Sequence, residues 1–307
     1  MTKQNSQLFG YSKGAQVLQV PVQELPLDVI NQVVFSQVLE HNAMLQLCMT
    51  LIVPRTPQPK PAIIYYPGGG FTSSKRDQFI EMRVALAKTG FVVAAVEYRV
   101  VPHQFPAPII DGKAAIRYLR QHAKEFTINP DRIGVLGDSA GGYMAQMMTL
   151  AESEEFDQGD FLNQSSAVQA GVSIYGISNL LNIGEGFNDK LQQVHQSPAV
   201  TEALLVHGAA FNTFAGASIQ SDPDRALYAS PMGHIDGAKP PLLLMHGSDD
   251  PLVSPIQSQQ LYEQLQEREA LVDYIIVEKA GHADDDVWYQ PAITDTVCQW
   301  FKRHLLD

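Results

Sequence analysis

The sequence predicts an α/β protein with a mostly parallel central sheet. Short apolar runs of strand length alternate along the chain with longer segments that repeat apolar residues at helical spacing. Such alternation is typical of a parallel sheet that helices cover on both faces. A chain of 307 residues could hold two average domains, but α/β folds of this size are often one domain. We therefore expect a single domain over residues 1–307.

The first part of the chain gives the clearest strand and helix signals. Val29–Phe35 and Leu45–Val53 alternate or run apolar, which predicts two strands that can pair as a hairpin. Ala62–Tyr66 follows a proline-rich connection and is bounded by turn formers, as a buried strand would be. A helix is expected over Asp77–Lys88, because Gly90 stands where glycine commonly ends helices.

The alternation continues to the C-terminus. Phe91–Val96 and Arg132–Leu136 are further apolar runs, and Ile109–Phe126 between them repeats apolar residues at helical spacing. The remaining expected strands are Val168–Tyr175, Leu242–Met245 and Val272–Val277, and the remaining expected helices are Tyr143–Ala151, Ile256–Arg268 and Ala292–His304. The last helix has one apolar face, formed by Ile293, Val297, Trp300, Phe301 and Leu305.

A long segment, Gly176–Pro240, separates two of the expected core strands. It contains one predicted helix, Val200–His207, among several turn-forming residues. Connections within compact domains are usually much shorter than this. We therefore expect a cap-like insertion over the site, at about residues 176–240, rather than a separate domain.

Composition excludes several classes of function. Hydrophobic residues make up 45% of the chain and charged residues 18%, which allows a large core and argues against global disorder. The net charge of −12 argues against nucleic acid or an anionic membrane as a partner. No apolar stretch is long enough to span a membrane.

The expected location is cytoplasmic. Met1–Gly14 is polar and has no apolar core of a signal peptide. Cys48 and Cys298 lie in strongly apolar settings, so we expect two buried free thiols, which fit a reducing compartment.

The segment Gly137–Gly142 predicts a nucleophilic serine. It carries the pattern G-x-S-x-G between a predicted buried strand and a predicted helix, which is the context in which this pattern has chemical meaning. A serine on such a tight turn has its hydroxyl exposed, and the flanking glycines leave room for the neighbouring strand and helix. We interpret Ser139 as a nucleophile.

Nucleophilic catalysis by serine requires a base and an acid that orients the base. His282 follows the last predicted strand on a loop, where it is free to point into a site. Asp249 and Asp250 both follow the strand Leu242–Met245. We favour Asp250, because a bend at Pro251 would hold its carboxylate at the loop apex. The competing interpretation is that both aspartates cap the next helix.

The glycines after the strand Ala62–Tyr66 suit an oxyanion hole, a set of N–H groups placed where negative charge develops. Successive glycines can turn their amides inward without side-chain clashes. The donors that we predict are the N–H groups of Gly69, Gly70 and Ala140. A phosphate-binding loop is the rival interpretation, but no G-x-x-x-x-G-K-[ST] pattern follows.

Together these motifs resemble the hormone-sensitive-lipase-like branch of the α/β-hydrolases, and more closely its bacterial acetyl-esterase and feruloyl-esterase-like group. The matching segments are Tyr66–Phe71, Glu97–Arg99, Asn129–Gly142, His246–Val253 and Gly281–His282. The resemblance runs from about residue 30 to the end of the chain, and the order Ser139, Asp250, His282 is that of the α/β-hydrolase fold. It implies carboxylic-ester hydrolysis by a Ser–His–Asp triad, without a cofactor or metal.

The chain departs from the family pattern at Pro67, where the usual H-G-G-G motif has histidine. In the family this histidine is thought to brace the oxyanion loop through a hydrogen bond. Proline cannot do so, although its fixed φ can stiffen the loop. We interpret Pro67 as the mark of a subgroup.

The expected function is hydrolysis of small soluble esters, either acetyl and short acyl esters or hydroxycinnamoyl esters, with sugar esters included. Phe71, Tyr143 and Trp288 are candidates for substrate binding, although ordinary packing explains each of them equally well. An amide hydrolase of the formamidase or peptidase type would use the same triad. A ligand-binding protein on the same scaffold is the weaker alternative, because no triad member is missing. The expected partner is a small-molecule ester, and the sequence allows a homodimer.

Overall fold

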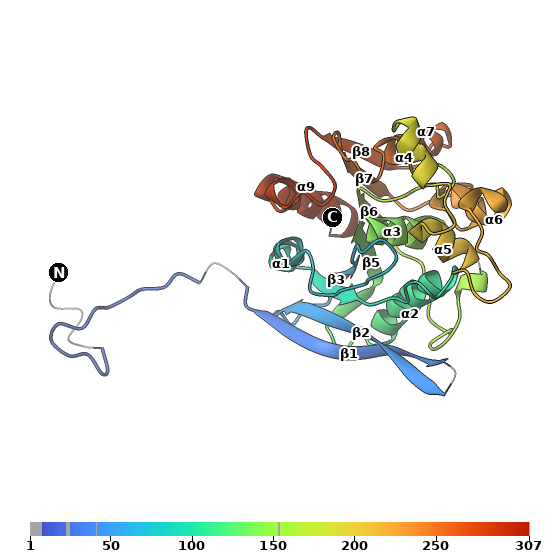
Figure 1. Cartoon of the computed structure of the whole chain (residues 1–307). Coiled ribbons are helices and arrows are strands. Elements are labelled where there is room, and N and C mark those ends of the chain that lie inside the picture. The colour runs from blue at the N-terminus through green and yellow to red at the C-terminus, as the bar shows by residue number, and fades with distance from the viewer. Residues whose placement is uncertain (1–7, 23–24, 41, 153, 307) are drawn as a thin grey trace.

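The structure, a computed structural model, describes residues 8–22, 25–40, 42–152 and 154–306. Within these residues eight strands form one sheet in the order β1-β2-β4-β3-β5-β6-β7-β8 (Figure 1). The strands are β1 (Leu27–Glu40), β2 (Ala43–Pro54), β3 (Lys60–Tyr66), β4 (Val92–Val96), β5 (Ile128–Asp138), β6 (Ala170–Ile174), β7 (Leu242–Gly247) and β8 (Val272–Val277). In this order every pair of neighbouring strands from β4 onward, through β3 and β5 to β8, is parallel. This confirms the predicted fold class.

The first two strands form the predicted hairpin. β1 pairs antiparallel with β2 from Leu27↔Pro54 to Glu40↔Ala43, with two irregularities in register. β2 in turn pairs antiparallel with β4, so the hairpin extends one side of the parallel sheet. In the described part of the chain β1 is consequently one edge strand of the sheet, and β8 is the other.

Helices cover both faces of the sheet. α1 (Ile80–Thr89) and α9 (Pro291–Leu305) pack on one face, together with inward side chains such as Ile63 and Tyr65 of β3. α2 (Ala107–Gln121) and α3 (Ala140–Leu150) pack on the other face, against the alternate β3 residues Ile64 and Tyr66. α7 (Ile256–Glu267) joins Leu150 of α3 over β7. Both cysteines are buried and unpaired, as expected.

Several predicted boundaries were wrong for identifiable backbone reasons. α1 begins at Ile80 and not at Asp77, because Phe79 has a φ of 52°, in the left-handed region that a right-handed helix excludes. β5 begins at Ile128, because Ile128 pairs with Lys60 of β3. The strand therefore includes Asn129–Asp131, which had been predicted as a turn. α2 ends at Gln121, five residues before the predicted Phe126.

The long segment between β6 and β7 folds into short helices. These are α4 (Asp189–Val194), α5 (Thr201–His207) and α6 (Pro223–Tyr228), with three-residue and four-residue 3₁₀ turns at Ile219–Ser221 and Pro231–His234. The Tyr143 hydroxyl near the start of α3 donates to the carbonyl of Ala229 at 2.6 Å. This contact places the C-terminal part of the segment beside the carboxyl edge of the sheet. That the segment acts as a cap stays a prediction.

The described N-terminal residues 8–22 run away from the body of the molecule (Figure 1). The predicted absence of a signal peptide concerns Met1–Gly14, of which residues 1–7 lie outside the described residues. Among the described helices, none combines the length and the apolar character that crossing a membrane requires.

The apolar face of α9 should carry a large share of the stability. Phe301 is fully buried and its ring lies 6.2 Å from that of Phe91. We expect Phe301→Ala to lower the free energy of unfolding by about 3–5 kcal/mol, because it leaves a cavity in the core. Phe211 is 83% exposed, so Phe211→Ala should change it by less than about 0.5 kcal/mol. Denaturant unfolding of both variants measures the contrast, and equal effects would contradict this account of the core.

Candidate active site

Ser139 stands on a strained turn between β5 and α3. Its φ of 53° and ψ of −121° are a conformation that non-glycine residues rarely adopt. Its N–H donates to the carbonyl of Ile174 at 2.9 Å, which ties the turn to β6. Neighbouring backbone comes very close, because a Cβ at Gly141 would lie 1.9 Å from the carbonyl oxygen of Tyr66. The glycines of the motif are therefore required sterically.

His282 links Ser139 to an aspartate. Its Nε2 lies 2.9 Å from Ser139 Oγ, and its Nδ1 lies 2.7 Å from Asp250 Oδ2. The His282 side chain is 8% exposed and that of Asp250 is fully buried. Since a carboxylate only accepts hydrogen bonds, Nδ1 carries the proton and Nε2 is left as an acceptor for the serine hydroxyl. The structure therefore brings together the three residues that the sequence nominated.

The structure also separates Asp250 from Asp249. Asp250 Oδ1 accepts hydrogen bonds from the N–H groups of Leu252 and Val253 at 2.9 and 3.0 Å, which leaves Oδ2 for His282. Asp249 is exposed and accepts from the Ser248 hydroxyl at 2.8 Å. α7 begins at Ile256 with Pro255 at its N-cap and no side-chain cap, so neither aspartate caps that helix.

A second histidine, His246, lies behind Asp250. Its Nε2 is 3.0 Å from the carbonyl of Val253 and 3.3 Å from Asp250 Oδ2, while its Nδ1 is 2.7 Å from Ser258 Oγ. Because a carbonyl oxygen is only an acceptor, Nε2 carries the proton and Nδ1 accepts from Ser258. The sequence analysis missed His246, although it directly precedes the acid loop at the end of a buried strand.

These hydrogen bonds determine the charge state of Asp250. Burial alone would raise the pKa of its carboxyl group, since low polarity disfavours the charged form. Hydrogen bonds from His246 and His282 and from the Val253 N–H outweigh burial and hold the pKa well below its ordinary value of 3.8. Asp250 is therefore a carboxylate at neutral pH.

The glycine loop after β3 presents N–H groups beside Ser139. Gly69 and Gly70 have φ values of 148° and 57°, which favour glycine. Ala140 is the first residue of α3, where backbone N–H groups have no partner within the helix. Within the described ranges, none of these three N–H groups donates to another protein group. They are available to an external oxygen atom.

Two hydrogen bonds brace this loop where the family pattern has histidine. The Pro67 carbonyl accepts from the Tyr98 hydroxyl at 2.6 Å. The Gly68 N–H donates to Asp138 Oδ1 at 3.1 Å, and the same oxygen accepts from the Tyr65 hydroxyl at 2.7 Å. Asp138 directly precedes Ser139, so one carboxylate joins the glycine loop to the serine turn. Asp138 lies inside the motif Gly137–Gly142, but the pattern G-x-S-x-G predicts no role for it.

Burial and hydrogen bonding shift the pKa of the Asp138 carboxyl group in opposite directions. Burial raises the pKa of its carboxyl group, and the Tyr65 and Gly68 hydrogen bonds offset only part of that effect. The tight fit extends to Gly68, where a Cβ would lie 2.5 Å from Asp138 Oδ2. Position 68 therefore requires glycine.

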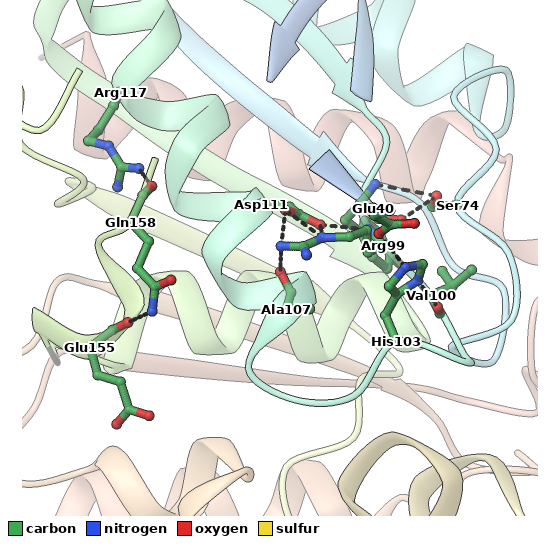
Figure 2. Close-up of polar contacts among 11 residues, drawn as sticks. Glu40, Ser74, Arg99, Val100, His103, Ala107, Asp111, Arg117, Glu155 and Gln158 are labelled. Carbon is green, nitrogen blue, oxygen red and sulfur yellow. Dashed lines mark hydrogen bonds and ion pairs between the residues drawn. The ribbon is translucent and has the colours of Figure 1, made fainter. Parts of the chain in front are cut away.

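Tyr98 is itself held in place by its neighbours. Its carbonyl accepts from the Ser74 hydroxyl at 2.9 Å. The adjacent Arg99 forms an ion pair of 2.8 Å with Asp111 of α2, and Figure 2 shows its guanidinium between Asp111 and the carbonyl of Ala107. Since the Asp111 side chain is 1% exposed, this pair anchors the segment after β4 to α2. Tyr98, which donates the hydrogen bond to the Pro67 carbonyl, is thus held in place by these contacts.

The three aromatic residues predicted to bind substrate lie beneath the site. Phe71, Tyr143 and Trp288 are each at most 2% exposed. The rings of Phe71 and Tyr143 pack edge to face, with centroids 5.1 Å apart. Trp288 packs on Tyr175, which contacts His282, and its Nε1 donates to the carbonyl of Gly281 at 2.9 Å. The structure shows packing roles for all three, and their part in substrate binding stays a prediction.

A family model and several known proteins resemble this chain. The BD-FAE family model matches residues 49–265. The chain is 29% identical to a probable carboxylic ester hydrolase, LipM, of Mycobacterium tuberculosis over 67% of this chain and 45% of that protein. It is 28% identical to esterase LipQ of the same organism, over 73% of this chain and 50% of that protein. The chain thus spans about half the length of these curated relatives.

Solved structures with the same fold have low sequence identity. A truncated carbohydrate esterase from gut microbiota superimposes with a TM-score of 0.77 at 22% identity, covering 94% of this chain and 100% of that one. A thermophilic esterase from Thermogutta terrifontis, solved with butyrate bound, gives a TM-score of 0.69 at 22% identity, covering 91% of this chain and 94% of that one.

The lowered pKa of Asp250 predicts a pH-dependent contribution to stability. A carboxyl group whose pKa falls on folding stabilises the native state above its unfolded value of 3.8, and this contribution is lost as the pH falls toward the folded value. We expect Asp250→Asn to lower the free energy of unfolding at about pH 7 and to do so by a smaller amount at about pH 3. Denaturant unfolding at both pH values measures the difference.

Asp249→Asn is the matched control for this experiment, because the Asp249 side chain is exposed. Its effect should stay small and nearly constant with pH. A deficit of Asp250→Asn that is equally large at both pH values would mean that the carboxylate contributes no charge-dependent stability.

Proposed function

The chain belongs to the BD-FAE family of α/β-hydrolases, and on that premise we propose that it is a serine carboxylesterase acting through an acyl-enzyme at Ser139. The observation that carries the proposal is the continuous set of hydrogen bonds from Asp250 through His282 to Ser139 Oγ, at 2.7 and 2.9 Å. The predicted oxyanion donors, the N–H groups of Gly69, Gly70 and Ala140, donate to no other group in the described part of the chain. This combination suits acyl transfer.

In the first half of the proposed reaction, Ser139 Oγ attacks the ester carbonyl carbon while His282 Nε2 takes the hydroxyl proton. The resulting tetrahedral intermediate collapses, the carbon–oxygen bond to the alcohol breaks, and His282 returns the proton to the leaving alcohol. Asp250 stays ionised throughout, because its lowered pKa lets it stabilise the imidazolium that forms on His282. The acyl group is then an ester of Ser139.

In the second half, water replaces the alcohol. His282 Nε2 takes a proton from the water molecule as its oxygen attacks the acyl carbon, and then returns the proton to Ser139 Oγ as the carboxylic acid leaves. In both halves the N–H groups of Gly69, Gly70 and Ala140 would stabilise the negative oxygen. Because Tyr98 and Asp138 already hold this loop, little reorganisation is needed when the charge develops.

The substrates that we propose are small neutral esters with acetyl, short acyl or hydroxycinnamoyl groups, including those of sugars. Acidic residues support a preference for neutral molecules, since Asp285 and Asp286 are exposed in α8 (Asp285–Trp288), close after His282. Structural neighbours suggest which esters to test first, because one is a carbohydrate esterase and another was solved with butyrate.

Ser139→Ala should lower kcat/KM for p-nitrophenyl acetate by at least about a thousandfold, because it removes the nucleophile. The wild-type protein should also form a covalent adduct at Ser139 with a fluorophosphonate probe, detected by mass spectrometry. A panel of p-nitrophenyl esters from acetyl to dodecanoyl, with methyl ferulate and acetylated xylan, then ranks the acyl groups. Full esterase activity in Ser139→Ala would refute the assignment, and a fluorophosphonate adduct without ester turnover would favour the amide substrates.

The choice of acid can be tested with two neighbouring substitutions. We expect Asp250→Asn to lower kcat by about 10⁴-fold, because an amide cannot hold the His282 tautomer or stabilise its protonated form. Asp249→Asn removes an exposed carboxylate that does not contact His282, so it should change kcat by less than about threefold. Steady-state kinetics on one ester measures both variants. The reverse ranking would assign the acid to Asp249.

A further inference from the structure

A concave site lies on the sheet beside α1, and its lining includes neither the catalytic triad nor the glycine loop after β3. It is a groove of about 770 Å³ between the first half of β1, β2 and the segment leading into α1. Ligand sites of small molecules commonly have volumes of about 300–1,000 Å³. The groove follows from the topology, because the hairpin extends the sheet past β4, beside α1 (Figure 1).

The walls of this groove are aliphatic. The side chains that provide them come from both strands and from α1, and they are Leu27, Val29, Ile52, Ile80 and Val84. Val29 is 59% exposed and Ile80 is 44% exposed. Apolar surface of this kind, gathered in a concavity, is stabilised when an apolar ligand removes it from water.

Arg83 lines the same groove and is a buried cation, with the carboxylates of Asp77 and Glu81 near it but outside ion-pair distance. The residue is only 3% exposed, and its Nε donates to the carbonyl of Gln78 at 2.9 Å. In the described ranges no carboxylate lies within ion-pair distance of its guanidinium, and neither terminal nitrogen donates a hydrogen bond. The Tyr65 ring, with its centroid 5.8 Å from Arg83 Cζ, provides a cation–π contact.

An arginine in this position is unusual, because buried charges in proteins are normally paired. Burial lowers the pKa of Arg83, and the nearby Tyr65, Asp77 and Glu81 oppose this shift in part. An external anion can therefore accept hydrogen bonds from the unpaired terminal nitrogens of Arg83. The neighbouring Arg76 differs, because its guanidinium bonds to Glu97, Thr50 and Gln32 at 2.7, 2.9 and 3.0 Å.

The charges of the groove match an anion of one negative charge. Its lining contains three cations, Lys75, Arg76 and Arg83, and two carboxylates, Asp77 and Glu97, which leaves a net charge of +1. A doubly charged phosphate would exceed this balance, whereas a carboxylate equals it. A guanidinium also binds a carboxylate well, because two parallel N–H groups can meet its two oxygens.

We propose that this groove binds a carboxylate with an apolar tail, such as a medium-chain alkanoate. The carboxylate contacts the terminal nitrogens of Arg83, and the exposed Lys75 adds a second positive charge at the groove. The hydrocarbon chain lies along the aliphatic side chains of β1, β2 and α1. The site is separate from Ser139 and does not depend on the esterase activity.

The test measures binding of octanoate to the full chain by calorimetric titration, with octan-1-ol as the uncharged ligand of equal chain length. We expect saturable octanoate binding that weakens at least about tenfold in Arg83→Met, because the charge-assisted hydrogen bonds are lost. Octan-1-ol should likewise bind at least about tenfold more weakly than octanoate to the wild-type protein. Arg83→Lys keeps the charge and should retain more affinity than Arg83→Met.

A second variant covers the case in which Arg83→Met fails to fold. Ile80 is 44% exposed and is the first residue of α1, so Ile80→Asp should fold normally and should repel octanoate, with a loss of at least about tenfold. The matched controls are Arg268→Met, at an exposed ion pair, and Leu162→Asp, at an exposed apolar residue, and both should bind like the wild type. Binding that is unsaturable, equally tight for octan-1-ol, or unchanged in Ile80→Asp would overturn the proposal.

Discussion

The close approach of the serine turn to the carboxyl ends of β3 and β6 is the constraint on which the rest of the site depends. A Cβ at Gly137 would lie 1.9 Å from the carbonyl oxygen of Gly141, and a Cβ at Gly141 would lie equally close to that of Tyr66. Glycine at both positions lets the strand, the turn and the helix pack without side chains between them. Ser139 is thereby held at a φ of 53°, and its hydroxyl points out of the sheet toward His282.

The same proximity lets one carboxylate serve two loops. Asp138 precedes the serine and accepts from the Gly68 N–H, so a hydrogen bond ties the serine turn to the glycine loop. The Tyr98 hydroxyl adds a second brace at Pro67. This pair of contacts explains how the loop is ordered in a chain that has proline where the family pattern has histidine. Hydrogen bonds to the backbone carbonyl and amide on either side of the Pro67–Gly68 peptide replace the missing imidazole.

The buried charged groups Asp250 and Arg83 differ in how many hydrogen-bond and ion-pair partners surround them. Asp250 is surrounded by donors from His246, His282 and two backbone N–H groups, so it stays ionised in a buried position. Arg83 has the cation–π contact with Tyr65 and one backbone acceptor. A buried charge that has enough partners helps to hold the residues around it in place. A buried charge that lacks partners and lines a groove is a place where a ligand can supply one.

Much of this protein was determined locally and could be predicted from the sequence. Apolar runs and helical spacing indicated every strand of the sheet and the helices that cover it. Burial on both faces makes the central strands continuously apolar, and burial of one face gives the helices their spacing. Ser139, Asp250 and His282 follow the parallel strands β5, β7 and β8, and parallel strands deliver such loops to one edge of the sheet. Tertiary structure decided what depends on distant segments. It gave Asp250, which the sequence already favoured, its contact with His282, brought His246 and Asp138 into the site, and placed the aromatic residues in the packing. It also formed the groove at Arg83 from two strands and a helix, because hydrogen bonds and burial between segments far apart in sequence leave no periodic signal along the chain.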